Sequence, residues 1–263
     1  MEKIITYFGA DSKVGVTMIT QSVANVLALK LKKQNKGEKV LLLHLDGKTG
    51  FEYTTKKGGS LDGIKAAVSS DVLALEELLD VCAQDENLYM LKGTSNLLER
   101  KSYEDSFVKK LMQAAEKAFD HILIDAGSSV DLGLAIGSLI HSNKNLLVAT
   151  QQTTCFESYM LKEEQIFNPL QITFDTLIIN KFAYSSGRML ETENSLMEKY
   201  GIKKSVCIPL ADYGWQAEFE RETIMAYHKP YSQGIRKLAN KIYLQMPVAG
   251  KEPLFKGVFR KKV

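Results

Sequence analysis

Residues 4–18 read IITYFGADSKVGVTM, and this stretch decides how the rest of the chain is interpreted. Its apolar start predicts a β-strand, its middle carries Gly9 and Gly15, and a helix is expected to open at Thr17. Backbone N–H groups and a helix N-terminus cradle phosphates in this strand–loop–helix context. The usual loop also carries a lysine for the β- and γ-phosphates, but Val16 occupies that position here. The stretch predicts a phosphate-binding loop whose chemistry is impaired or rewired.

Beyond this loop, short apolar runs alternate with longer helical patterns, which is typical of a parallel sheet covered on both faces. The runs are continuous in Val, Ile and Leu, as in strands that are buried on both sides. Strands are expected at residues 3–8, 39–45, 87–91, 120–125, 145–149, 175–180 and 205–208. Helices are expected at residues 17–35, 71–83, 103–118, 131–141, 157–167, 188–200, 214–226 and 229–245. The buried face of the first helix is expected to carry Ile19, Val23, Val26, Leu27 and Leu31.

These patterns predict an α/β fold with a doubly wound, mainly parallel β-sheet flanked by helices. Residues 46–70 are rich in Gly, Lys, Ser and Thr and are expected to form a mobile connection. No internal repeat or linker is evident in the sequence. Residues 1–246 are therefore expected to form one domain, followed by a tail of residues 247–263.

Composition limits the partners and the compartment. The net charge of +3 is too small to demand nucleic acid as a partner. Cys82, Cys155 and Cys207 lack metal-type spacing and are expected to be reduced thiols. The first residues show no signal-peptide pattern, and no apolar stretch approaches the roughly 18 residues that a membrane span needs. A cytoplasmic protein is expected.

Two further stretches make a resemblance specific. One is HLDG at residues 44–47, where a second strand ends in an acid, and the other is FDHILIDAGSS at residues 119–129. With the loop, they resemble the ParA/MinD family of deviant P-loop ATPases. The resemblance implies a P-loop NTPase fold, with ATP and Mg²⁺ as cofactors.

The family's loop reads Lys-Gly-Gly-Val-Gly-Lys-Thr-Thr, and the matching residues here read DSKVGVTM. Val16 replaces the phosphate lysine, and Asp11 replaces the signature lysine that reaches the partner subunit's nucleotide. Lys13 is the cation left in the loop, and its long flexible stem could bring the ammonium to the phosphates; the alternative is a solvated Lys13. The nucleotide-binding residues implied are Ser12, Lys13, Val14, Gly15, Val16, Thr17 and Met18.

Thr17 is placed to cap the helix N-terminus and to offer its hydroxyl to Mg²⁺, and capping alone would explain it equally well. Asp46 matches the family acid that helps to position the attacking water, whereas His44 stands where the family has its first acid. Asp125 matches the acid that holds Mg²⁺ through water, and a turn-forming aspartate is the alternative at both acid positions. In LIINKF, Asn180 matches the family amide that reads adenine.

Two segments of the C-terminal half complete the resemblance. Pro209, in CIPLADYG, matches the stretch that lies against the base in the family. The tail reads EPLFKGVFRKKV over residues 252–263, and it resembles the membrane-targeting helix at the end of MinD proteins in position and pattern. Alternatives are a tail folded back on the domain or a disordered charged end. The residues of the apolar face of this tail are Leu254, Phe255, Val258 and Phe259.

The hypothesis is a nucleotide-dependent homodimer that recruits a protein partner to a membrane-located assembly, such as a pilus, secretion or division site. Hydrolysis would be slow or absent without the loop lysine. The unusual loop also resembles the TadZ/CpaE branch, and no receiver-like domain of the kind common there is expected within residues 1–263. Competing hypotheses are a nucleotide-free scaffold and a chromosome or plasmid partitioning ATPase. The scattered lysines do not favour the nucleic-acid contact that partitioning needs.

Overall fold

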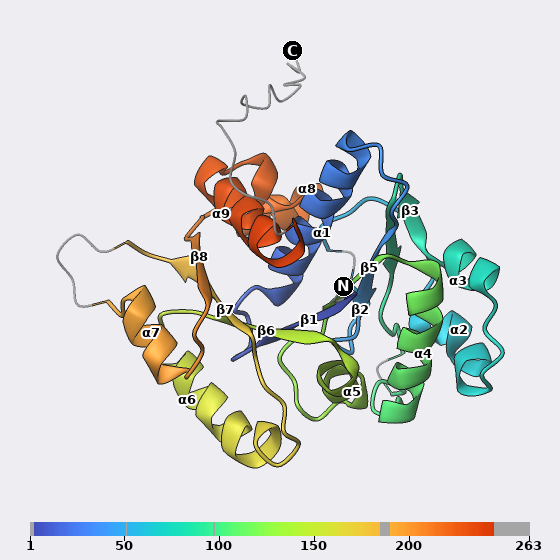
Figure 1. Cartoon of the computed structure of the whole chain (residues 1–263), viewed down its shortest axis with the longest axis horizontal. Helices are drawn as coiled ribbons and strands as arrows, with labels where there is room; N and C mark the ends of the chain where they lie inside the picture. The colour runs from blue at the N-terminus through green and yellow to red at the C-terminus, as the bar shows by residue number, and fades with distance from the viewer. Residues whose placement is uncertain (1–2, 51, 97, 185–189, 245–263) are drawn as a thin grey trace.

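A sheet of eight strands runs through the residues that the computed structural model describes, which are 3–50, 52–96, 98–184 and 190–244 (Figure 1). The strand order is β3-β4-β2-β5-β1-β6-β7-β8, and each neighbouring pair is parallel except β3 with β4. The strands are β1 (Ile4–Gly9), β2 (Val40–His44), β3 (Ala83–Asp85), β4 (Leu88–Leu91), β5 (His121–Asp125), β6 (Lys144–Ala149), β7 (Thr176–Phe182) and β8 (Ser205–Pro209). The predicted fold class is confirmed.

Helices cover both faces of this sheet. α1 packs against α9 on one face, and α4 packs against α5 on the other (Figure 1). The helices are α1 (Val16–Lys33), α2 (Leu61–Ser69), α3 (Leu75–Val81), α4 (Asp105–Ala118), α5 (Gly133–His141), α6 (Thr153–Lys162), α7 (Glu193–Lys199), α8 (Gly214–Glu220) and α9 (Lys229–Ala239). Within the described residues, none of them has the length and apolarity to cross a membrane.

The central strand β1 positions the candidate site. β5 lies on one side of β1 and β6 on the other, so consecutive strands of the chain are placed on opposite sides of it. Ligands of open α/β sheets bind beyond the carboxyl ends of the strands at such a switch point. The loop that follows Gly9 therefore starts at the position where a ligand is expected.

Several predicted boundaries were wrong. The expected connection at 46–70 contains α2, whose Leu61, Ile64 and Val68 are buried at helical spacing; its Gly- and Ser-rich composition concealed this pattern. The helix expected at 71–83 is the shorter α3. The last residue of the predicted range, Ala83, begins β3, a strand of three residues that is too short to predict. The helix expected at 214–226 breaks at Arg221, which has φ of 54°.

The other helices differ in length from their predicted ranges. α6 begins earlier than expected and continues as a π-helical turn over Glu163–Phe167. α9 likewise ends in a π-helical turn over Asn240–Leu244. The helix expected at 188–200 is α7, which is shorter among the described residues.

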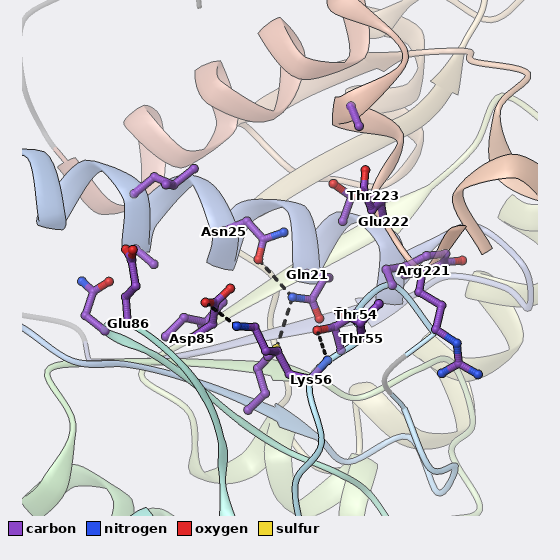
Figure 2. A pocket seen from close by; sticks show the side chains of 17 residues that line it. Gln21, Asn25, Thr54, Thr55, Lys56, Asp85, Glu86, Arg221, Glu222 and Thr223 are labelled. Carbon is purple, nitrogen blue, oxygen red and sulfur yellow. Dashed lines mark hydrogen bonds and ion pairs between the residues drawn. The ribbon is translucent and has the colours of Figure 1, made fainter. Parts of the chain in front are cut away.

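α1 is covered on more than one side. The five apolar residues predicted for its buried face are all buried, as are Thr20, Gln21 and Ser22. Gln21 donates from Nε2 to Asn25 Oδ1 at 3.1 Å, and both side chains line a cavity of about 380 Å³ beside α1 (Figure 2). Tyr53 lines this cavity and also the candidate site described below.

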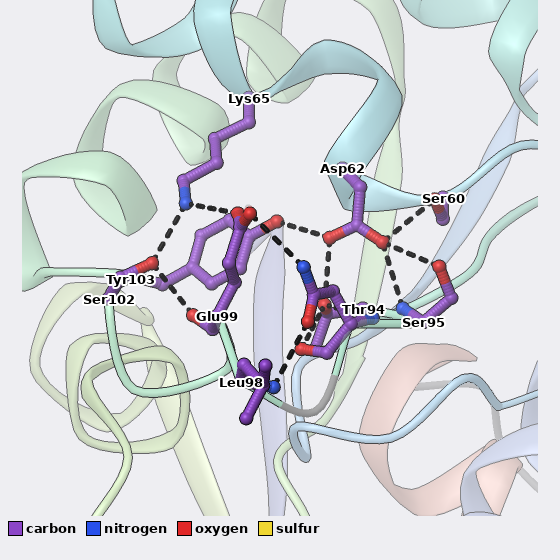
Figure 3. A network of polar contacts seen from close by, with 10 residues as sticks. Ser60, Asp62, Lys65, Thr94, Ser95, Leu98, Glu99, Ser102 and Tyr103 are labelled. Atoms are coloured by element: carbon purple, nitrogen blue, oxygen red, sulfur yellow. Dashed lines mark hydrogen bonds and ion pairs between the residues drawn. The ribbon is translucent and has the colours of Figure 1, made fainter.

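A polar network fastens α2 to the loop that follows β4 (Figure 3). Asp62 Oδ1 accepts hydrogen bonds from the hydroxyls of Thr94 and Tyr103, each at 2.7 Å. Its Oδ2 accepts from the backbone N–H and the hydroxyl of Ser95, each at 2.8 Å. Partial burial raises the pKa of Asp62, but these hydrogen bonds outweigh that effect and hold the pKa well below its usual range.

Replacing Asp62 with asparagine is expected to lower the free energy of unfolding by about 1–2 kcal/mol at pH 7, because an amide cannot accept at both oxygen positions. A carboxyl whose pKa is depressed by folding stabilises the protein above its unfolded pKa, and this stability is lost as the pH falls toward the folded pKa. Urea unfolding at pH 7 and at pH 3 should therefore show a difference that shrinks in acid. Glu99→Gln is the matched control, because Glu99 is an exposed carboxylate paired with Lys65. An equal loss of unfolding free energy in that variant would contradict the prediction.

Candidate functional site

The loop between β1 and α1 is held by residues from distant parts of the chain. The backbone N–H of Gly9 donates to Gly127 O at 2.7 Å, and that of Ala10 donates to Val148 O at 2.8 Å. Lys162, half-buried at the end of α6, donates from Nζ to Ala10 O at 2.7 Å. Burial lowers the pKa of this lysine, and the Asp11 carboxylate counters part of that effect. The start of the loop is thus fixed to the ends of the two strands beside β1.

The N-terminus of α1 faces the space beyond this loop. Gly15 precedes the helix with φ of 94°, and the first helical bond runs from Ile19 N to Gly15 O at 3.1 Å. The N–H groups of Val16, Thr17 and Met18 therefore have no acceptor within the helix. No acidic side chain lies in the first turn of α1. The arrangement leaves three backbone donors for an anion.

Thr17 does not cap the helix, so that prediction was wrong. The helix begins at Val16, which makes Thr17 its second residue, and the residue that precedes the helix is Gly15, which makes no side-chain cap. The helix starts one residue earlier than expected because the left-handed backbone of Gly15 turns the chain directly into it. The Thr17 side chain lines the cavity instead.

Two residues of β7 hold the loop from its other side. Asn180 donates from Nδ2 to Val14 O at 2.7 Å, and a Cβ atom on Gly15 would lie 2.5 Å from this nitrogen. Lys181 donates from Nζ to Lys13 O at 2.8 Å. Its φ of 54° accompanies an irregularity in the pairing of β7 with β8 between Ile179 and Phe182. The amide predicted to read adenine is thus bonded to the loop.

A cavity of about 660 Å³ opens where these elements meet, within the range of small-molecule sites. It brings together most of the residues predicted from the sequence. The predicted residues that line it are Lys13, Val14, Gly15, Val16, Thr17, Met18, Asp46, Asn180 and Pro209. Ser12 and Asp125 do not line it: Ser12 is exposed and donates from its N–H to Asp11 Oδ1, and Asp125 is fully buried.

Asp125 lies beneath the cavity and contacts His44. Asp125 Oδ2 lies 3.5 Å from His44 Nδ1, and both side chains are almost completely buried. Although burial opposes the charge, the carboxylates of Asp125, Asp46 and Glu52 raise the pKa of His44 above its ordinary value. Asp125 Oδ1 accepts a hydrogen bond from Gly127 N at 3.1 Å. His44 therefore places an imidazole beside the acid to which the resemblance gives Mg²⁺.

Asp46 faces the cavity from the end of β2. Its Oδ1 accepts from Lys48 N at 3.0 Å, and its Oδ2 lies 3.8 Å from Lys48 Nζ. Burial and the neighbouring Asp125 carboxylate raise the pKa of Asp46 to about 6. A Cβ atom on Gly127 would lie 2.7 Å from Asp46 Cβ, so the two strand ends approach closely here.

The charged side chains of the cavity do not by themselves favour a polyanion. The lysines that line it are Lys13, Lys48 and Lys181. The carboxylates that line it are Asp11, Asp46, Glu52 and Glu218. Because carboxylates outnumber lysines, a triphosphate would need a divalent cation and the backbone N–H groups to offset its charge.

The oxygen donors of the cavity fit Mg²⁺. The Thr17 hydroxyl and the Asp46 carboxylate both line it, and hard oxygen ligands are what Mg²⁺ prefers. No group of three or more His, Cys, Asp or Glu side chains suited to a metal occurs in the described part of the chain. Mg²⁺ characteristically uses one or two carboxylates together with water and substrate phosphates, so this sparse set is compatible with it.

Sequence reasoning missed several groups at this site. Lys181 was overlooked although it directly follows Asn180, because nothing in the sequence shows that its backbone turns toward the loop. Lys48 and Tyr53 were assigned to a mobile connection, but both line the cavity. Lys162 gave no signal, since it lies far along the chain from the carbonyl that it holds.

Solved structures provide the comparison. A ParA family ATPase from Chlorobium tepidum TLS superimposes with a TM-score of 0.73 at 19% identity, covering 90% of this chain and 98% of that one. The septum site-determining protein MinD from Pyrococcus horikoshii OT3, in complex with Mg-ADP, gives 0.72 at 17% identity, covering 93% and 97%. The MinC:MinD cell division protein complex of Aquifex aeolicus gives 0.71 at 16% identity, covering 95% and 99%.

The ParA/MinD-like fold expected from the sequence is confirmed by these similarities. No protein-family model matches the sequence, and no curated protein matches it. At identities below one in five, the likeness concerns the fold. The residues predicted to form the membrane-contacting face of the tail, 254–259, lie outside the described residues.

Proposed function

We propose that this chain, which has the fold of ParA and MinD ATPases, binds ATP with Mg²⁺ and forms a homodimer in response. In this proposal the dimer recruits a protein partner to a membrane-located assembly such as a pilus, secretion or division site. The observation that carries the proposal is the cavity at the end of β1, where a helix N-terminus, lysines and oxygen donors face one space. The MinD structure with Mg-ADP and the MinC:MinD complex support a nucleotide and a protein partner for proteins of this fold.

The residues of the chain have distinct roles in this proposal. The N–H groups of residues 16–18 hold the phosphates, and Lys13 and Lys181 offset part of their charge. Thr17 and Asp46 hold Mg²⁺, which when bound neutralises phosphate charge. Asp125, which does not line the cavity, would act on Mg²⁺ through a water molecule. Pro209 also lines the cavity, and the base would lie against it.

Val16 makes slow or absent hydrolysis part of the proposal. Its side chain is 6% exposed and apolar, so it cannot stabilise charge that develops on a transferring phosphoryl group. The nucleotide then acts mainly as a ligand for dimerisation. A cytoplasmic protein held peripherally on the membrane by residues 254–259, and a place in the TadZ/CpaE-like branch, are further parts of the proposal. Hydrolysis at rates typical of P-loop ATPases when a partner is added would contradict it.

Melting with and without Mg-ATP is the experiment that tests nucleotide binding. At 100 times the dissociation constant, the ligand should stabilise the folded state by roughly 2.7 kcal/mol, which raises Tm by a few degrees. Removing the cation with EDTA should abolish most of this shift, because carboxylates outnumber lysines in the cavity. ADP serves as the control for the γ-phosphate.

The competing function is a scaffold that keeps the fold without nucleotide. The His44–Asp125 pair favours it, since the imidazole of His44 lies 3.5 Å from the acid to which the resemblance gives Mg²⁺. The excess of carboxylates along the cavity favours it as well. A Tm that stays unchanged at millimolar Mg-ATP would select the scaffold.

Restoring the missing lysine is expected to strengthen nucleotide binding. In Val16→Lys, an ammonium would enter the cavity next to the free N–H groups, and a charge-assisted hydrogen bond of about 1.5–3 kcal/mol corresponds to an affinity gain of roughly tenfold or more. Titration calorimetry with Mg-ATP measures the gain. Val16→Met supplies a side chain of comparable length without charge, and an equal gain in that variant would show that the lysine charge is not responsible.

A further inference from the structure

α8 exposes an aromatic surface that the proposed nucleotide site does not use. Trp215 is 92% exposed and Phe219 is 88% exposed, and their spacing of four residues places them on one face of the helix. They line a hollow of about 740 Å³ together with Thr49, Gly50, Glu52, Glu218 and Arg221. Exposed aromatic side chains grouped around a hollow mark an interaction surface.

The surroundings of this aromatic face are acidic. Residues 210–222 carry one basic residue, Arg221, and the carboxylates Asp212, Glu218, Glu220 and Glu222. Glu52 adds a carboxylate to the lining of the hollow. The surface therefore fits a segment that is apolar on one side and basic around it.

We propose that, in the protein that is not bound to a membrane, the α8 face is the docking surface for the C-terminal segment of the same chain, residues 252–263. This segment has the complementary chemistry, since two phenylalanines and two aliphatic residues are interspersed with basic residues over residues 254–262. The residues of its apolar face are Leu254, Phe255, Val258 and Phe259, and its basic residues are Lys256, Arg260, Lys261 and Lys262. Seated on α8, the phenylalanines would cover Trp215 and Phe219 while the basic residues meet the surrounding carboxylates.

The chain between the end of α9 and the C-terminal segment is long enough for that segment to reach α8. The start of α9 lies beside the start of α8, because the ring of Tyr213 stacks on Tyr227 with centroids 6.2 Å apart and lies 5.8 Å from His228. α9 and its π-helical end, residues 229–244, span at most about 24 Å. Residues 245–253 reach about 30 Å when extended, so the segment that follows them can come back along α9 to α8.

Trp215 is the single tryptophan of the chain, so its fluorescence reports this contact directly. In the full-length protein, docking predicts blue-shifted emission and several-fold weaker quenching by acrylamide than in full-length Phe255→Asp/Phe259→Asp. High salt should move the wild-type emission toward that of the variant, because part of the contact is electrostatic. Val72→Asp removes an apolar side chain that is 70% exposed elsewhere, and it should leave the emission unchanged.

A substitution on the docking surface provides an independent arm. Phe219→Ser replaces an exposed side chain, so folding should persist, and the Trp215 emission should shift to the red as it does in the tail variant. Circular dichroism and Tm confirm that each variant is folded. The readout needs no nucleotide, so a failure here is separate from a failure of ATP binding.

Three results would overturn the proposal. Wild-type emission already typical of exposed tryptophan, and indifferent to the tail substitutions, would leave the surface unoccupied. A blue shift that grows with protein concentration would assign the face to a second copy of the chain. A blue shift seen only with vesicles of anionic lipid would assign the aromatic pair to a lipid surface.

Discussion

Replacing Gly15 with alanine is expected to lower the free energy of unfolding by about 2–5 kcal/mol and to abolish the Mg-ATP shift in Tm. Gly15 has φ of 94°, which costs an alanine roughly 1–2 kcal/mol. The added Cβ would also lie 2.5 Å from Asn180 Nδ2 and push this amide away from Val14 O. A buried polar group left without a partner adds about 1–3 kcal/mol to the cost.

Alanine substitutions at two other glycines distinguish the backbone cost from the cost of the contact with Asn180. Gly201 also has positive φ, of 64°, but no atom lies within 4 Å of its added Cβ, so Gly201→Ala should show the backbone cost alone. Gly63 has neither feature and lies within α2, so Gly63→Ala should be neutral or slightly stabilising. Urea unfolding of the three variants gives the comparison. Equal losses for Gly15 and Gly201 would show that the contact with Asn180 contributes nothing.

Replacing Asp46 with asparagine is expected to stabilise the protein without ligand while removing its response to Mg-ATP. Folding raises the pKa of Asp46 from its ordinary value of 3.8 to about 6, so its stability contribution is full below pH 3.8 and is lost as the pH rises toward 6. Two pKa units correspond to at most about 3 kcal/mol at pH 8. The amide oxygen of the substituted side chain could still accept from Lys48 N.

Unfolding measured at pH 8 and at pH 4 tests the sign of this effect. The stabilisation by Asp46→Asn should be largest at pH 8 and should nearly vanish at pH 4, where the wild-type carboxyl is protonated. Asp131→Asn is the control, because hydrogen bonds from Ser129 and Lys101 lower the pKa of that exposed carboxyl and the small expected effect has the opposite sign. Destabilisation by Asp46→Asn at pH 8 would contradict the prediction.

The sequence predicted the sheet because its strands are buried on both faces and therefore read as unbroken apolar runs. β1, β2, β5, β6 and β7 were all found within a residue or two of their predicted ends. β3 was missed because it spans three residues and its outward positions are polar. α2 was missed because Gly63 and the serines around it are typical of loops, although Leu61 and Ile64 are fully buried.

At the site, the sequence predicted the residues of the loop itself and missed the residues from elsewhere that donate hydrogen bonds to it. Val14, Gly15 and Thr17 occupy a contiguous motif, so their shared location follows from chain continuity. Lys162 and Lys181 reach the loop through tertiary packing, which no local pattern records. The pairing of His44 with Asp125 depends on the neighbouring positions of β2 and β5, and the sequence does not state strand order.

The shape of the loop between β1 and α1 is set by side chains that lie outside it. The carbonyls of Ala10, Lys13 and Val14 are each bonded to a side chain from elsewhere in the chain. The loop is therefore held in place before any anion arrives, and little ordering entropy remains to be lost on binding. Residues such as Ser12, which is exposed, can be exchanged without altering the cradle. A loop built in this way can lack both lysines of the loop that it resembles and still keep a phosphate-binding shape, so the shape of the loop does not depend on its charged side chains.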